Sequence, residues 1–375
     1  MQAPTGILEI DLDALAENFR RLQREAAGAE LAPAVKADAY GLGLAPVART
    51  LAAAGAGRFF VANLGEGLAL RRLLPAAGVF VLNGPLPGEE RDYLAEALVP
   101  VLNTLAQVRL WQGAARAAGR PLAAALHLDC GINRLGLTPA EAARLAAEPA
   151  RLDGLAIDLV MGHLASADDA GNPANAEQRD RFRRAADALP AAVRRAPRSL
   201  AASCGLFLGP DFRLDLARPG YALYGGNPTP GRPNPMRPVV GLKARILQAR
   251  RVDPPAGVGY GATHRVERPA QLVTLAIGYA DGLFRALSNR GRLVVDGQAV
   301  PIVGRISMDL TVVDASALPP ERLSPGGFAE ILGPGQDIDA LAADAGTIGY
   351  EVLTALGRRH RRVYCGGPSG EPAEV

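Results

Sequence analysis

The chain has 375 residues, 49% hydrophobic and 21% charged, a composition typical of a globular enzyme with room for more than one domain. Its formal net charge of +3 is small for this length and argues against a nucleic-acid or membrane-surface partner. No basic segment followed by an apolar run opens the sequence, and no stretch of about 20 apolar residues occurs. The three scattered cysteines favour reduced thiols over a disulfide framework, so we expect a cytoplasmic protein.

From residue 31 onward, short apolar runs alternate with amphipathic helical segments. The predicted strands cover residues 31–36, 58–63, 78–83, 98–102, 122–129, 155–163, 199–203 and 214–218. Thr138 to Glu141 form a capping box with proline at the first helical position, which marks one helix start. Eight strands, each followed by a helix or loop, predict a (β/α)8 TIM-like barrel. A doubly wound sheet is the competing fold, but no GxGxxG motif follows an early strand.

The composition and hydrophobic pattern of the sequence change after residue 224. Residues 225–238 are rich in Gly, Pro and Asn, as linkers often are, and β-like runs separated by turn residues follow them. We therefore expect an α/β chain with a (β/α)8 barrel over residues 8–228 and a mainly antiparallel β domain over residues 235–375. Residues 1–7 are a candidate segment for packing on the β domain.

Lysine is rare in this chain. Of the 41 basic residues, only Lys36 and Lys243 are lysines. A guanidinium stays protonated and cannot act as an amine nucleophile, so a lysine that remains in such a background is a candidate for chemistry. For Lys243, in an amphipathic strand-like run, chance retention is the preferred interpretation. Lys36 differs because it ends the first predicted strand.

Polar or charged side chains end or follow five of the predicted barrel strands, where barrel enzymes carry their active sites. These residues are Lys36, Arg134, His163, Ser203 and Arg218. Phosphate groups in such barrels commonly bind at the loops after strands seven and eight, and here those loops contain Ser203 and Gly220. A lysine, a phosphate cradle and a nearby arginine together indicate pyridoxal phosphate as the ligand.

The sequence around Lys36, AVKADAYGLG, resembles the pyridoxal-lysine signature of bacterial alanine racemases. Eight further segments follow in that family's order: LDCGINRLG, MGHLASAD, NPANAEQ, DLARPGYALYG, VGYGATH, IGYADG, GRISMD and YEVLTALGRR. An ordered set over two domains is far more specific than one short match. The resemblance implies pyridoxal 5'-phosphate as cofactor and interconversion of L-alanine and D-alanine, with D-alanine supplied for peptidoglycan. It also implies a homodimer in which each active site joins one barrel to the partner's C-terminal domain.

The resemblance also implies roles for individual residues. Lys36 holds the cofactor and serves as one base, while Tyr260 of the partner subunit is the opposite base. Two bases are needed because racemisation removes the α-proton from one face and returns a proton to the other. His163 and Arg218 form a hydrogen-bonded chain toward Tyr260, and Arg218 also donates to the pyridine nitrogen. Without the resemblance, Tyr260 would be a packed aromatic in a turn and His163 an ordinary histidine at a strand end.

Further contacts follow from the same resemblance. Tyr40, Ser203, Gly220 and Tyr221 cradle the phosphate, Arg134 contacts cofactor and substrate carboxylate, and the Met308 backbone contacts that carboxylate from the partner chain. Tyr279 matches an entry-channel tyrosine. No metal site is expected, because the four histidines lack metal-ligand spacing.

The sequence departs from the family pattern at three positions. His127 stands where many members carry a lysine, often as a carbamate. We expect His127 to be neutral, with water, a small anion or Asp129 satisfying Arg134. Ala202 replaces an asparagine before the phosphate serine, and Arg358 is expected in place of a C-terminal phosphate-binding tyrosine.

Other functions remain open at this stage. A pyridoxal-phosphate carrier on the same barrel would lack the β domain with Tyr260. A basic-amino-acid decarboxylase of related architecture would lack the VGYGATH tyrosine. A serine or broad-specificity racemase differs only in a few pocket side chains, which the sequence does not resolve.

Overall fold

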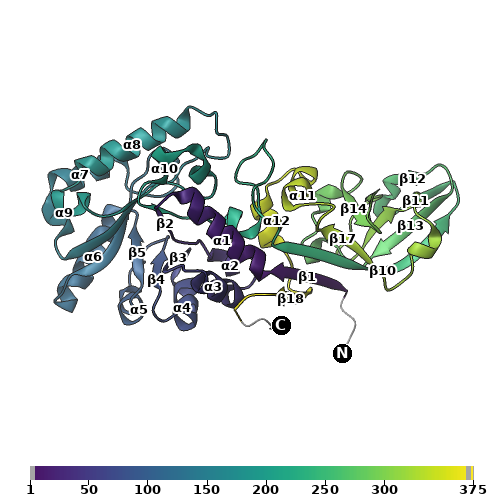
Figure 1. The fold of residues 1–375 in the computed structure, drawn as a ribbon, viewed down its shortest axis with the longest axis horizontal. Helices are drawn as coiled ribbons and strands as arrows, with labels where there is room; N and C mark the ends of the chain where they lie inside the picture. The colour runs from purple at the N-terminus through teal and green to yellow at the C-terminus, as the bar shows by residue number, and fades with distance from the viewer. Residues whose placement is uncertain (1–4, 369–372, 375) are drawn as a thin grey trace.

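A computed structural model describes residues 5–368, 373 and 374, and it consists of a barrel and an elongated β domain that extends to one side of it (Figure 1). The barrel strands are β2 (Glu30–Leu31), β3 (Arg58–Val61), β4 (Gly78–Val81), β5 (Val99–Leu102), β6 (Leu122–His127), β7 (Leu155–Met161), β8 (Arg198–Ser199) and β9 (Leu216–Ala217). Strands β3 to β8 pair in parallel and in chain order, and β2 pairs in parallel with β9.

Hydrogen bonds at two places close these strands into a ring. A parallel bridge joins Ala34 to Phe60, next to β2 and β3. Between β8 and β9, the Asp215 amide donates to the Arg198 carbonyl (3.0 Å) and the Arg218 amide to the Ala201 carbonyl (2.9 Å). The predicted eight-stranded parallel barrel is therefore confirmed, although β2, β8 and β9 are shorter than the apolar runs that predict them.

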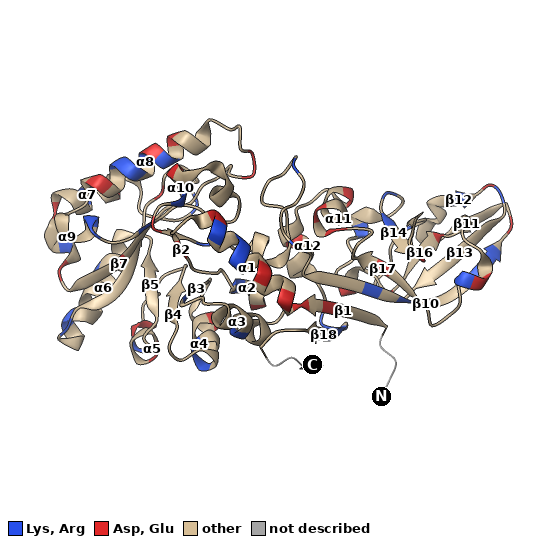
Figure 2. Cartoon of the chain, in the orientation of Figure 1, with Lys and Arg blue, Asp and Glu red and all other residues tan. Residues whose placement is uncertain are grey.

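Helices cover the outside of the barrel and alternate with its strands. They are α1 (Leu12–Ala26), α3 (Leu44–Ala53), α4 (Leu64–Leu73), α5 (Glu90–Ala95), α6 (Leu105–Ala118), α7 (Pro139–Ala147), α8 (Ala174–Ala188), α9 (Ala191–Arg194) and α10 (Pro210–Arg213). The predicted capping box is present at α7, where Thr138 Oγ1 accepts from the Glu141 amide and the Glu141 carboxylate from the Thr138 amide. Figure 2 shows that both α1 and α8 carry basic and acidic residues.

The second domain is built on a mostly antiparallel sheet. Its strands are β1 (Gly6–Asp11), β10 (Val240–Val252), β13 (Ala270–Leu275), β14 (Arg292–Val295), β15 (Gln298–Pro301), β16 (Thr311–Asp314), β17 (Phe328–Leu332), β18 (Arg361–Cys365) and β19 (Ala373–Glu374). A separate hairpin, β11 (Ala256–Val258) and β12 (His264–Val266), lies at the end of this domain farthest from the barrel (Figure 1). Helices α11 (Ile338–Ala345) and α12 (Gly349–Ala355) lie at the end nearest the barrel.

The N-terminal strand β1 belongs to this second sheet. It pairs antiparallel with β10 and parallel with β18 along its length, although more than 200 residues separate it from either partner. The predicted boundary at residue 8 falls inside this strand, so the sheet takes residues from both sides of that boundary. Lys243 on β10 donates to both carboxylate oxygens of Glu9 at 3.1 Å, a structural ion pair that agrees with its assignment as a non-catalytic lysine.

Across the described part of the chain, no helix is long and apolar enough to span a membrane. Nor do the described His, Cys, Asp and Glu side chains gather into a group that could hold a metal ion.

Candidate active site

Lys36 lies at a sharp turn of the backbone where the first barrel strand ends. The next four residues, 37 to 40, have φ between 53° and 57°, the left-handed region, and none is a glycine. This conformation costs roughly 1–2 kcal/mol per residue, and such strain persists only where surrounding groups hold the backbone. Strand β2 covers Glu30–Leu31 and so only the first residue of the predicted strand over 31–36, but backbone hydrogen bonds from Ala32, Ala34 and Val35 continue along the barrel wall as far as this turn.

Two carboxylates hold the turn. Glu66 accepts from the Ala37 amide (2.8 Å) and from the Ala62 amide (2.7 Å), so it joins the turn to the loop after β3. Asp38 Oδ1 accepts from the Leu44 amide (2.7 Å). Sequence reasoning did not single out either residue, because these bonds depend on the tertiary position of Glu66 and on a backbone conformation with no glycine to signal it.

The Lys36 amine lies in a partly buried, positively charged environment. Burial lowers the pKa of Lys36, the nearby Arg134 guanidinium lowers it further, and Glu66 opposes the shift. A lowered pKa increases the fraction of neutral amine, the form that attacks a carbonyl carbon. The surroundings of Lys36 thus suit an amine nucleophile.

Arg218 is buried below the same rim and donates to three groups. Its Nη1 donates to Ser199 Oγ, and its Nη2 donates to the Gly162 carbonyl (2.6 Å) and, at 3.4 Å, to His163 Nδ1. Burial lowers the pKa of Arg218 to about 10, so it remains protonated at neutral pH. A guanidinium has five N–H donors. Among the described residues, the Nε hydrogen and one Nη1 hydrogen of Arg218 have no acceptor.

His163 is neutral in this environment. Burial, and then the charge of Arg218, lower its pKa to about 3. Because Arg218 can only donate, Nδ1 of the neutral ring must be the acceptor, and Nε2 carries the proton. His163 therefore offers an N–H donor at the rim, with its protonation state fixed by the arginine behind it.

Ser203, Gly220 and Tyr40 form a polar turn at the end of the last barrel strands. Ser203 Oγ accepts from the amides of Gly220 (3.0 Å) and Ala222 (3.1 Å). A Cβ at Gly220 would overlap the Tyr40 hydroxyl, so only glycine fits here. Burial raises the pKa of Tyr40 to about 12, and its hydroxyl therefore stays a hydrogen-bond donor. Hydroxyls and close backbone amides are the groups that bind a phosphate.

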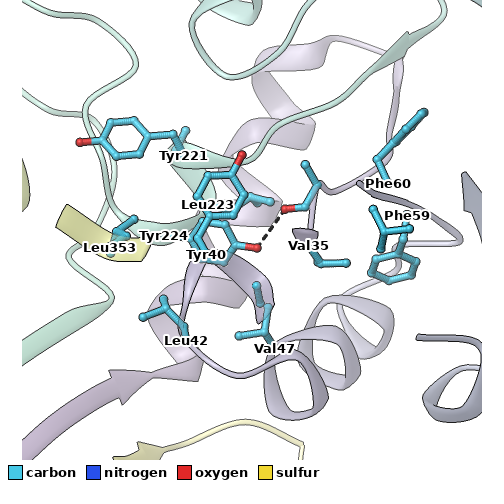
Figure 3. Close-up of a cluster of buried hydrophobic side chains, with 14 of the residues drawn as sticks. Val35, Tyr40, Leu42, Val47, Phe59, Phe60, Tyr221, Leu223, Tyr224 and Leu353 are labelled. Atoms are coloured by element: carbon cyan, nitrogen blue, oxygen red, sulfur yellow. Dashed lines mark hydrogen bonds between the residues drawn. The ribbon is translucent and has the colours of Figure 1, made fainter. Parts of the chain in front are cut away.

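An aromatic cluster lies next to this turn (Figure 3). The Tyr40 ring lies 4.7 Å from that of Tyr224, whose hydroxyl donates to the Ala34 carbonyl (3.0 Å). Tyr350, at the start of α12, lies 6.2 Å from Tyr40, ring centre to ring centre. The sequence predicts no C-terminal tyrosine here, with Arg358 in its place, but Tyr350 supplies one. Its position was missed because nothing in the local pattern TIGYEV shows which face of α12 meets the barrel.

Arg134 lies on the exposed loop between β6 and α7. Asp129, one of the acceptors expected for it, forms no ion pair with it among the described residues, and Asp129 Oδ1 instead accepts from the amides of residues 131, 132 and 133 at 2.9–3.2 Å. Asp129 therefore shapes the loop and does not neutralise Arg134. No acceptor for the Arg134 guanidinium occurs among the described residues, which leaves it available for a ligand carboxylate.

His127 points into the barrel toward Asn103. The two atoms His127 Nδ1 and Asn103 Oδ1 are 2.8 Å apart, and Asn103 Nδ2 donates to the carbonyls of Leu82 and Val101. The amide orientation is thereby fixed, so His127 Nδ1 must be the donor. Burial first, and then Arg218, lower the pKa of His127 to about 4. The prediction of a neutral His127 agrees with this, and its Nε2 is a buried acceptor without a described partner.

We expect the stability of the protein to fall as pH falls below about 6.5. An unfolded histidine has a pKa near 6.5, whereas folded His127 and His163 have pKa values of about 4 and about 3. Below pH ~6.5 the unfolded chain binds protons that the folded chain does not, so the free energy of unfolding drops by up to about 1.4 kcal/mol per pH unit for each histidine. Urea unfolding of wild type and His127→Gln between pH 7 and pH 5 measures this. Equal slopes for the two proteins would exclude the contribution of His127.

Three residues that the sequence assigns to the site lie on the other domain. Tyr260, 73% exposed, is in the turn η4 (Tyr260–Ala262) between β11 and β12, at the far end of the β domain (Figure 1). Tyr279 and Met308 are 45% and 53% exposed on neighbouring loops of that domain. The structure brings Lys36, Tyr40, His163, Ser203, Arg218 and Gly220 to one end of the barrel, but it does not bring Tyr260 to them within one chain.

Comparison with known families decides the assignment. The family model for the N-terminal domain of alanine racemase matches residues 10–228, and that for its C-terminal domain matches residues 239–364. The chain belongs to the alanine racemase family. An alanine racemase of Acidiphilium cryptum is 53% identical over 363 residues, which cover 97% of this chain and 99% of that protein. A catabolic alanine racemase of Mesorhizobium japonicum is 48% identical over 366 residues, which cover 97% and 94%.

The fold agrees with this membership. The crystal structure of an alanine racemase from Bartonella henselae with covalently bound pyridoxal phosphate has a TM-score of 0.93 and 37% identity to this chain, and covers 97% of it and 100% of that chain. A (β/α)8 barrel followed by a mostly antiparallel β domain is therefore confirmed as the architecture of the chain.

Proposed function

We propose that the chain interconverts L-alanine and D-alanine with pyridoxal 5'-phosphate, using Lys36 and Tyr260 of the partner subunit as the two proton-transfer bases. Full-length membership of the alanine racemase family supports the reaction, and the cofactor is the one that the Bartonella henselae protein binds covalently. The observation that carries the proposal is the arrangement at the barrel rim. The lysine with a lowered pKa, the arginine-bound histidine and the Ser203–Gly220 turn all lie at that one end.

The residues at the rim fit this cofactor. The missing Cβ at Gly220 leaves room for the Tyr40 hydroxyl beside the turn, and Ser203, Tyr40 and Tyr350 would offer hydroxyls to a phosphate there. The Arg218 guanidinium would donate a hydrogen bond to the pyridine nitrogen without protonating it, since a guanidinium keeps its protons. When bound, pyridoxal phosphate supplies an electron sink that makes the α-proton of an amino acid removable.

The two bases transfer protons on opposite faces of the substrate's α-carbon. Lys36 takes or returns the proton on the side of the barrel from which it projects, and Tyr260 does so on the opposite side. Neutral His163 donates its Nε2 hydrogen toward the Tyr260 oxygen and so favours its deprotonated form. Arg134 binds the substrate carboxylate, and the Met308 backbone of a second copy contacts the same group.

The position of Tyr260 supports the proposal of a head-to-tail homodimer. In one chain, Tyr260 is exposed at the end of the β domain farthest from the barrel (Figure 1), so under the proposed roles a second copy supplies it to Lys36. The exposed Tyr279 and Met308, on neighbouring loops of the same domain, also suit a surface that a partner covers. We infer that each active site contains one barrel and the β domain of the other subunit.

The direction of net flux depends on the cell. Two enantiomers have equal free energies in water, so the enzyme itself favours neither. We propose a cytoplasmic enzyme that supplies D-alanine for peptidoglycan, with breakdown of alanine as the alternative, since some relatives are named catabolic. Deletion of the gene distinguishes these roles: a D-alanine requirement supports the first, and lost growth on alanine as carbon source supports the second.

An assay of the purified holoenzyme with L-alanine, L-serine and several other L-amino acids tests the reaction. We expect D-alanine to form fastest, and formation of other D-amino acids at equal rates would indicate a broad-specificity racemase instead. Amine loss or decarboxylation without a D-product would exclude racemisation.

A further inference from the structure

Tyr221 follows Gly220 in sequence, and its side chain points away from the Ser203–Gly220 turn. Tyr221 begins the short helix η3 (Tyr221–Tyr224), which ends the barrel, yet its side chain packs against the β domain. Figure 3 shows its hydroxyl pointing away from the Tyr40–Tyr224 ring pair. The Ser203 hydroxyl accepts from the amides of Gly220 and Ala222, on either side of Tyr221, so that turn does not explain why a tyrosine side chain stands here.

Four contacts fix the Tyr221 side chain. Its hydroxyl donates to Asp339 Oδ1 on α11 at 2.6 Å, and the other Asp339 oxygen accepts from the Asn227 amide at 2.9 Å. Its ring stacks on Tyr350 of α12, with centres 4.1 Å apart and planes 14° from parallel. A Cβ at either Gly226 or Gly349 would overlap the ring or its hydroxyl. The ring therefore occupies a slot between two glycines, closed by an aspartate and a second tyrosine.

This slot connects the Ser203–Gly220 turn to the second domain. The Tyr221 backbone continues directly from Gly220, whose amide is held by Ser203, and the Tyr221 ring fixes one face of Tyr350. Tyr350 in turn lies beside Tyr40, whose hydroxyl is next to Gly220. Burial and the Asp339 carboxylate both raise the pKa of Tyr221, so its hydroxyl stays protonated and keeps donating to Asp339. Movement of α11 or α12 would therefore shift groups next to the Ser203–Gly220 turn.

We propose that Tyr221 and Asp339 are positioning residues for the phosphate end of the cofactor. Through the hydrogen bond and the ring stack, they hold the Gly220–Tyr221 backbone and the Tyr350 ring at a fixed separation. This inference rests on the proposed function, because it requires a phosphate-bearing ligand in the cradle. It assigns a role to the Tyr221 side chain in addition to that of its backbone.

Binding of two ligands that differ only in the phosphate tests the proposal. Full-length wild type, Tyr221→Phe and Asp339→Asn are stripped of cofactor and titrated with pyridoxal 5'-phosphate and with pyridoxal. We expect each variant to raise the Kd for pyridoxal 5'-phosphate about tenfold, since a buried hydrogen bond to a charged group is lost. The Kd for pyridoxal should change less than about twofold, because the Lys36 end of the site is intact. The double variant should lose no more affinity than the weaker-binding single variant, since both changes break one contact.

Tyr93→Phe is the matched control. Its buried hydroxyl donates to the Gly84 carbonyl at 3.0 Å, on the side of the barrel that carries α5. We expect it to lower the unfolding temperature while leaving both affinities unchanged. Equal loss of affinity for both ligands in Tyr221→Phe, or none, would overturn the proposal, and Asp339→Asn decides it if Tyr221→Phe does not fold. If wild type itself does not bind pyridoxal 5'-phosphate, the proposed function fails instead.

Discussion

Lys36→Arg is expected to lower racemisation by at least about 10⁴-fold and to remove the covalent cofactor link. Arginine keeps the positive charge but cannot attack a carbonyl or accept a proton at neutral pH. Lys243 does not substitute for it, because it lies on β10 in an ion pair with Glu9. The sequence contains no other lysine.

Borohydride reduction measures this directly. In wild type, reduction should fix the cofactor to one peptide, the one that contains Lys36, and it should fix none in Lys36→Arg. Lys243→Arg is the control and should be labelled and active like wild type, since a guanidinium also pairs with Glu9. Covalent labelling of Lys36→Arg would show that another group holds the cofactor.

Tyr260→Phe is expected to keep the cofactor but to lose racemisation by about 10²–10⁴-fold, the range for loss of a positioned base. Exchange of the α-proton should persist with one alanine enantiomer more than with the other, because Lys36 still serves one face. Proton exchange in deuterated water, followed separately for L-alanine and D-alanine, reports the two faces. Equal and near-wild-type exchange with both enantiomers would show that Tyr260 is not a base.

Mixing the two inactive variants tests whether the active site is shared. If Tyr260 of the partner subunit completes the site, a mixed dimer of Lys36→Arg and Tyr260→Phe has one intact site and one doubly altered site. Random reassortment of equal amounts should therefore restore about a quarter of wild-type activity. If each chain supplied both bases to its own site, mixing would restore nothing.

The sequence predicts the architecture because its patterns are local. Alternating strands and helices reveal the barrel, and the Gly- and Pro-rich segment near residue 230 marks the change of domain. The partners of β1 could not be predicted in this way, since an alternating strand has no signal that selects a sheet more than 200 residues away. The left-handed turn after Lys36 was also missed because Ala37, Asp38 and Ala39 are not residues that announce it.

The same distinction between local and long-range signals applies to the residues of the site. Lys36, His163, Ser203 and Arg218 could be placed together from sequence because each follows a barrel strand, and strands of a parallel barrel end on one rim. Tyr350 and Asp339 could not, because their contacts with Tyr40 and Tyr221 depend on how α11 and α12 dock on the barrel. Asp129 was one of three alternatives, with water and a small anion, for satisfying Arg134, but its Oδ1 accepts hydrogen bonds from three backbone amides of its own loop.

The separation of Lys36 from Tyr260 in one chain also has a consequence for dosage. If two chains must meet to complete a site, turnover per chain depends on how much protein is present. Dilution below the dissociation constant of the dimer would then inactivate the enzyme without unfolding either domain. A cell that makes little of this chain would have less activity than its protein level suggests, and an inactive chain made alongside it would occupy active partners.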